Sequence, residues 1–140
     1  MTTYLGTAIR TRLINDTDVT DVCEQRVYPQ AFPENVTFPA VRYSLTGSSR
    51  QPLVDAASGV VESDFQIDIY ASTYLVCHQL AKAVRETLQQ YIGVVGSLDI
   101  LGIRVVNQMD LYEPPVDSDD VGLFRVIFDF EVVHGESVPS

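Results

Sequence analysis

The chain has 140 residues, of which 46% are hydrophobic and 20% are charged. This size and composition fit one globular domain, and they exclude an intrinsically disordered chain and argue against a separate second domain. The 19 acidic and 9 basic residues give a formal net charge of −10, which disfavours binding to the phosphates of nucleic acid.

The two cysteines and the first residues bear on the compartment. Cys23 and Cys77 lie far apart without a C-x-x-C spacing, so we expect two reduced thiols and no disulfide. The first residues lack the basic and apolar segments of a secretion signal, and no apolar run approaches the roughly 18 residues of a membrane span. We therefore expect a cytoplasmic protein without membrane contact.

The first third of the chain is predicted to contain one helix and one strand. Apolar side chains at helical spacing predict a helix over Thr3–Ile14, and Val19–Cys23 adds a short helical turn. Pro29 keeps the backbone extended, and residues 30–39 form a loop. Alternation over Ala40–Thr46 predicts a strand.

The middle of the chain carries the clearest patterns. Residues 47–59 lack periodicity and are too long for a tight turn. Polar and apolar residues alternate over Val60–Ala71, which predicts a half-buried strand. After Ser72, apolar residues recur every three or four positions as far as Tyr91, which predicts an amphipathic helix closed by Gly93.

Two further strands are predicted in the last third. They cover residues 101–112 and 123–134, separated by an acidic turn over Glu113–Gly122 and followed by a loose tail. Strict alternation in the first of them places on one face Leu101, Ile103, Val105, Asn107, Met109 and Leu111, and on the other Arg104, Val106, Gln108, Asp110 and Tyr112.

The predicted fold class is therefore α+β. We expect a mainly antiparallel sheet of about four strands, made of two hairpins joined by a crossover helix, with two helices packed on one face. One domain covers residues 1–134, and residues 135–140 form a flexible tail. The exposed face of the sheet is more apolar than solvent requires, which is typical of a subunit contact. Its candidate interface residues are Tyr70, Val106, Tyr112, Ile127 and Val133.

Signals for chemistry are missing from the sequence. No G-x-S-x-G, H-E-x-x-H, G-x-x-x-x-G-K-[ST] or G-x-G-x-x-G string occurs. His78 and His134 have no Cys or His neighbour at a ligand spacing, and a calcium loop starting at Asp117 would place Phe128 where a Glu is required. Four carboxylates alternate with core residues and are predicted to be outward side chains of strands, namely Asp64, Asp68, Asp110 and Asp129. We expect no catalytic, cofactor or metal site.

Five segments in order resemble the tail completion proteins of long-tailed bacteriophages and prophages, also called tail terminators or head-to-tail joining proteins. These segments are Arg26–Pro29, Phe38–Tyr43, Phe65–Ala71, Asp110–Glu113 and Leu123–Phe130. Each is weak alone, and their order, spacing and the length of the chain carry the resemblance.

This resemblance implies a structural virion protein without catalytic residues or cofactors. Members of the family form a ring, commonly of six subunits, that caps the tail tube and meets the head connector at the neck, with DNA passing through the bore. An acidic bore suits this passage, because a basic one would bind phosphate. The implied partners are copies of the chain, the tail tube protein and the connector, and the implied location is the virion, assembled in the host bacterial cytoplasm.

The two long loops are further candidate contacts. We expect them to project from the sheet and to meet neighbouring subunits, the tube or the DNA path, although tips without a role stay open as an alternative. The residues are Ser48, Ser49, Arg50 and Gln51 in the first loop, and Asp117, Asp119 and Asp120 in the acidic second loop.

Two other functions stay open from the sequence. One is a different phage protein of the same fold, such as a minor tail component or a head-side connector. The other is a host protein that binds a small molecule between the sheet and its helices. Location in the particle separates the first from a tail completion protein, and a thermal-shift screen with metals and metabolites tests the second.

Overall fold

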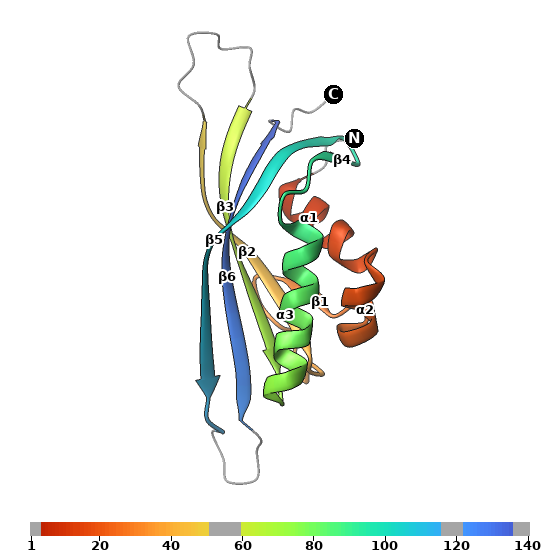
Figure 1. Cartoon of the computed structure of the whole chain (residues 1–140), viewed down its shortest axis with the longest axis vertical. Coiled ribbons are helices and arrows are strands. Elements are labelled where there is room, and N and C mark those ends of the chain that lie inside the picture. Colours follow the sequence, from red (N-terminus) through yellow and green to blue (C-terminus); the bar gives the residue numbers. More distant parts are fainter. Residues whose placement is uncertain (1–3, 51–59, 116–121, 136–140) are drawn as a thin grey trace.

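The computed structural model describes residues 4–50, 60–115 and 122–135, and in these residues three helices cover one face of a twisted six-stranded sheet (Figure 1). The helices are α1 (Leu5–Ile14), α2 (Thr17–Cys23) and α3 (Tyr74–Leu88). The strands are β1 (Val27–Pro29), β2 (Ala40–Arg50), β3 (Val60–Ala71), β4 (Gly93–Val95), β5 (Leu98–Glu113) and β6 (Leu123–Gly135).

The strands lie in the order β1-β2-β3-β6-β5-β4. β2 and β3 form one antiparallel pair, β5 and β6 form another, and α3 crosses from one pair to the other, as predicted. The expected number of four strands is wrong, because the short β1 and β4 extend the sheet at its two sides. Neither strand is long enough to show an alternating pattern in the sequence.

The described helices also outnumber the two expected. The carboxylate of Asp16 accepts hydrogen bonds from the backbone N–H groups of Asp18 and Val19, so it caps α2 as a helix of its own. Thr73 caps α3 in the same way through the N–H of Val76. These caps explain why both helices begin where they do.

The core lies between the helices and the sheet. Alternate side chains of β3 and β6 are buried there, including Phe65, Ile67, Phe128 and Phe130, and they pack against the apolar stripe of α3. The predicted inward faces of these three elements are confirmed. Each fully buried side chain of this size contributes about 1.5–3 kcal/mol to folding.

The predicted faces of β5 are correct only for Ile103–Val105, because Leu101, expected on the face of the buried Ile103, is 42% exposed. The strand shifts register against β6 between Ile100 and Gly102 and again between Val105 and Asn107. Each β-bulge inserts one residue, so the side chains beyond it change faces. After the second bulge Gln108 pairs with the buried Phe128, and Met109 pairs with Ile127 on the opposite face.

The sheet is longer than the layer of helices that covers it. In Figure 1 the β2–β3 pair runs past the helices at one end, and the β5–β6 pair runs past them at the other. Both ends therefore carry strand surface that no helix covers in the described residues.

Candidate functional site

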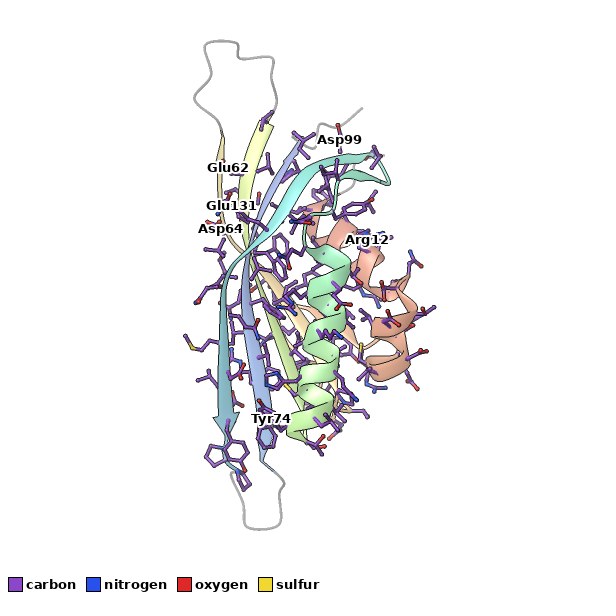
Figure 2. The ribbon with its side chains drawn as sticks, viewed as in Figure 1. Arg12, Glu62, Asp64, Tyr74, Asp99 and Glu131 are labelled. Carbon is purple, nitrogen blue, oxygen red and sulfur yellow. The ribbon has the colours of Figure 1, made fainter. Side chains whose placement is uncertain are left out.

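The face of the sheet opposite the helices is the first candidate site. Cross-strand partners Asp64 and Glu131 lie side by side on this face, and Gln66 pairs with Asp129 next to them. Figure 2 shows Glu62, Asp64 and Glu131 on the side of the sheet away from α3. One base, Arg104, joins Glu131 in an ion pair of 3.1 Å. We call Glu62, Asp64, Asp129 and Glu131 the acidic patch.

Exposed apolar side chains share this face. Val106, Met109 and Leu111 are 55%, 48% and 41% exposed. The half-buried Ile127 is the cross-strand partner of Met109, and the half-buried Val133 lies farther along β6, opposite Gly102. Such a group of apolar side chains on a strand surface is more than a solvated face needs. Val106 and Ile127, expected at an interface, do lie on this face, whereas Met109 and Leu111 reach it only because of the bulge.

Tyr70 does not belong to the exposed part of this face, contrary to the sequence prediction. It is 6% exposed, because the loop before β2 folds over it. The ring of Phe32 meets that of Tyr70 edge-on with 5.2 Å between centroids, and Phe38 lies 6.1 Å away. A loop contact between residues distant in sequence is invisible to a period-two pattern.

Tyr112 is also placed differently from the prediction. It pairs with Phe124 on the helix side of the sheet, with 4.9 Å between the ring centroids, and is 53% exposed. Ser48 faces the helix side as well, and its hydroxyl lies 3.0 Å from that of Ser63. Ser49 and Arg50 end β2, whereas Gln51, Asp117, Asp119 and Asp120 fall outside the described residues.

A buried ion network crosses the lower part of the same face. The carboxylate of Asp68 is 4% exposed and accepts hydrogen bonds from Arg42 at 2.9 and 3.1 Å. Arg125 lies 3.2 Å from the other oxygen of Asp68 and 3.3 Å from Glu113. Burial raises the pKa of Tyr70, although the two neighbouring guanidinium groups oppose it. The network pairs two bases with two acids and so holds β2, β3, β5 and β6 together, although Arg125 Nε is buried without a hydrogen-bond partner.

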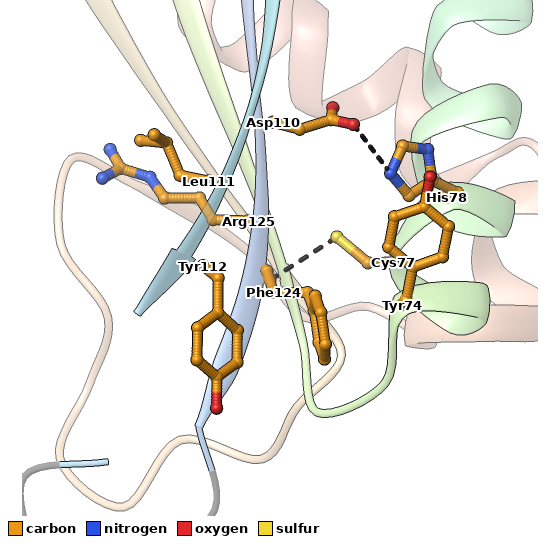
Figure 3. A pocket seen from close by; sticks show the side chains of 8 residues that line it. All are labelled: Tyr74, Cys77, His78, Asp110, Leu111, Tyr112, Phe124 and Arg125. Atoms are coloured by element: carbon orange, nitrogen blue, oxygen red, sulfur yellow. Dashed lines mark hydrogen bonds and ion pairs between the residues drawn. The ribbon is translucent and has the colours of Figure 1, made fainter. Parts of the chain in front are cut away.

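A small cleft opens on the helix side, between α3 and the end of the β5–β6 pair (Figure 3). It has a volume of about 240 Å³ and is lined by the rings of Tyr74, Tyr112 and Phe124. His78 Nε2 lies 3.2 Å from Asp110 Oδ2 across it, whereas Leu111 and Arg125 point to the other side of the sheet. Asp110 was expected to face away from the helices, and the second bulge of β5 accounts for the difference.

The thiol of Cys77 beside this cleft is buried. Burial raises the pKa of Cys77 to about 11, and the charge of Asp110 adds to the effect. Its Sγ lies 3.5 Å from the carbonyl oxygens of both Ile69 and Phe124, either of which can accept its single proton. Burial likewise raises the pKa of Cys23 to about 11. Reactive cysteines have lowered pKa values, so both thiols serve packing.

A serine and a histidine that are far apart in the sequence also meet in the structure. Ser63 Oγ lies 2.8 Å from His134 Nε2, and His134 Nδ1 lies 2.6 Å from the carbonyl oxygen of Gly135. Both side chains are buried, at 2% and 7% exposure. A nucleophile must be reached by its substrate, so this pair is a satisfied polar contact of the sheet.

Two other kinds of site, a metal centre and a membrane-spanning helix, are absent from the part of the chain that the structure describes. In residues 4–50, 60–115 and 122–135 no group of three or more His, Cys, Asp or Glu residues is arranged to hold a metal ion. None of the described helices is both long and apolar enough to cross a membrane.

A scan against protein families matches residues 7–135 to the family described as Tail completion protein gp17. The chain belongs to this family. Tail completion proteins are structural proteins of the bacteriophage tail, and the family is not a class of enzymes. The resemblance seen in the sequence is thereby confirmed.

Solved structures add the fold. A chain from the "Virion of native gene transfer agent (GTA) particle" is 17% identical, with a TM-score of 0.67 and 94% of each chain covered. A second solved chain is 14% identical, with 94% of this chain and 96% of that chain covered. Its TM-score of 0.44 is too low to support an argument. No curated protein matches the chain.

The segments that carry the family resemblance converge on the buried ion network. Arg42, Asp68, Glu113 and Arg125 come from four of the five segments, and they meet within hydrogen-bond distance. The fifth segment joins them through Arg26, whose Nε donates to the carbonyl oxygen of Pro39. The five segments therefore join the loop before β2 to the strands of the sheet.

Proposed function

We propose that the chain is the subunit of a six-membered ring that caps the tail tube and joins it to the head connector, with DNA passing through the bore. The observation that carries the proposal is the sheet face opposite the helices, which combines exposed apolar side chains with the acidic patch. Membership of the tail completion family supports the same role.

The apolar and acidic parts of this face have different tasks in the proposal. Val106, Ile127, Val133 and the neighbouring Met109 lie at contacts with other virion subunits, where burial of apolar area stabilises assembly. The acidic patch faces the DNA path, where its charge repels phosphate and leaves DNA free to move. The ends of the two long hairpins, beside Ser48 and Glu113, extend toward neighbouring subunits, the tube or the connector.

Purified tail tubes test the ring. The chain is mixed with tubes that lack it, and negative-stain electron microscopy is used to look for an added ring at one tube end. We expect one ring per tube with six-fold symmetry and restored joining to filled heads. A chain that binds neither tubes nor connectors at high concentration contradicts the proposal. Binding to the head vertex alone identifies a head-side connector instead.

A further inference from the structure

Among the described residues, the outer edges of β2 and β5 are each unpaired over part of their length. β1 pairs with β2 only from Val41 to Tyr43, and β4 pairs with β5 only from Leu98 to Ile100. Just beyond these pairs, Gln30 N–H donates to the carbonyl oxygen of Tyr43, and Gln90 N–H donates to that of Ile103. From there on, no strand among the described residues pairs with the outer edge of β2 or of β5.

Open edges are usually protected by charges, proline or β-bulges, and these two carry only one bulge each, between Leu45 and Gly47 in β2 and between Val105 and Asn107 in β5. An unpaired edge exposes N–H and C=O groups to any other strand, so proteins commonly place charges or proline there. In β2 the stretch Ser44–Ser49 contains no charged residue or proline, and in β5 the same holds for Val105–Met109. In a chain of net charge −10, these are stretches where a second copy can approach without meeting carboxylates.

An apolar cleft lies beside the open edge of β2. It has a volume of about 400 Å³ and is lined by Leu5 of α1, by Tyr43 and Leu45 of β2, and by Phe65 of β3. Leu45 is 53% exposed there. Peptides that add a strand to a sheet gain affinity from backbone hydrogen bonds and specificity from pockets that take alternate side chains. This cleft supplies such a pocket on the helix side.

We propose, building on the ring function above, that subunits join by sheet extension, with the β5 edge of one copy paired to the β2 edge of the next. Within the sheet, β2 and β5 run in opposite directions, because β2, β3, β6 and β5 are each antiparallel to their neighbour. Rotation about a ring axis keeps these directions, so the new contact is an antiparallel pair. The contact is head-to-tail, which is the type that generates rings.

The positions of the two open edges also require the strands to be inclined to the ring axis. The strand pairings show which parts of β2 and β5 lie at the same height in the sheet. The free half of β2, Ser44–Arg50, lies at the height of the first half of β5. The free half of β5, Asn107–Glu113, lies at the height of the first half of β2. Joining the free halves therefore offsets neighbouring subunits along the strand direction. A ring closes with such an offset only when the strands are inclined to its axis, as in a β-barrel.

Paired cysteines test this contact in the full chain. Ser48→Cys is combined in turn with a cysteine at Val106, Asn107, Gln108 or Met109, which covers neighbouring registers, and rings are oxidised on tail tubes or in concentrated solution. We expect at least one double variant to give a ladder of disulfide-linked oligomers, and each single variant to remain a monomer on a denaturing gel. The native thiols are buried and give little background.

The matched control pairs Gln108→Cys with Gln79→Cys, an exposed position on α3, and no ladder is expected from it. Rings without a ladder from any Ser48 pair overturn the sheet extension and leave the ring function intact. Dimers from Gln108→Cys alone indicate a two-fold β5 contact, and crosslinks to the tube protein indicate a different occupant, so both also overturn it. The absence of rings with tubes rejects the ring function itself.

Discussion

Asp68 shows how one residue can look exposed in the sequence and be buried in the fold. It alternates with core residues on β3, yet Arg42, Arg125 and the loop over Tyr70 enclose it. Removing its carboxylate leaves Arg42 without an acidic partner and leaves Arg125 with Glu113 alone, at 3.3 Å. Arg125 is the less able to compensate because its Nε is already buried without a hydrogen-bond partner.

We predict that Asp68→Ala lowers the free energy of unfolding by about 3 kcal/mol, measured by urea denaturation. Glu24→Ala is the control. Glu24 is 79% exposed in its ion pair with Arg26, and its loss is expected to cost less than about 1 kcal/mol. Equal effects of the two substitutions would contradict the structural role of the buried network.

The thiols give a prediction about pH. In the unfolded chain both thiols lose their protons near pH 9.0, whereas in the folded chain burial raises the pKa of each to about 11. Between these values the folded state holds more protons than the unfolded state, so stability is full below pH 9 and falls as the pH rises toward 11.

The measurement is urea unfolding at pH 8, 9, 10 and 11 for the native chain and for a Cys23→Ala, Cys77→Ala variant. We expect the native chain to lose more stability across this range than the variant does. At pH 8 a thiol reagent should modify both cysteines only in urea. Rapid modification of the folded chain would mean that the thiols are accessible.

The loop before β2 packs against the sheet although it has no regular secondary structure. Phe32 contacts the rings of Tyr28, Phe38 and Tyr70, and it lies 5.2 Å from the guanidinium group of Arg42. We predict that Phe32→Ala costs about 2 kcal/mol and speeds amide exchange in Ile67–Ala71, because the cover over the ion network is lost. Pro33→Ala, an exposed change in the same loop, should leave exchange unchanged. Protection that persists in Phe32→Ala would show that the loop is not the cover.

The spacing of apolar residues predicted correctly those elements that are regular along their whole length. β3, β6 and α3 each keep one period over their whole length, so their buried faces followed from the sequence. The prediction for β5 is wrong beyond about Val106. A residue inserted there reverses the two faces of the strand, and no residue type in the sequence marks such an insertion.

Which candidate interface residues lie on the outer face of the sheet was predicted in part for the same reasons, and their place at an interface stays a prediction. Val106 and Ile127 lie on the outer face as expected, but Tyr70 is covered by the loop and Tyr112 lies across the sheet. These outcomes depend on contacts between distant segments, which a single sequence does not reveal. The open edges of β2 and β5 were hidden too, because strand order is a property of the whole sheet.

At the scale of the whole molecule, net charge and charge placement are separate properties. The chain carries −10 overall, with exposed carboxylates on α2 as well as in the acidic patch. In the proposed ring, only carboxylates that line the bore would affect DNA at short range, because screening in salt limits the reach of a charge to about 10 Å.

We predict that Asp64→Lys with Asp129→Lys makes assembled rings retain DNA, and that Asp18→Lys with Asp21→Lys on α2 does not. Each pair changes the net charge of a subunit from −10 to −6, since every Asp-to-Lys change adds two charges. Two new phosphate contacts per subunit should make retention at least about tenfold weaker in 200 mM than in 50 mM salt. Gel-shift titration of rings with linear DNA at both salt concentrations measures this. Equal retention by both variants would mean that total charge matters and that the acidic patch does not face the DNA.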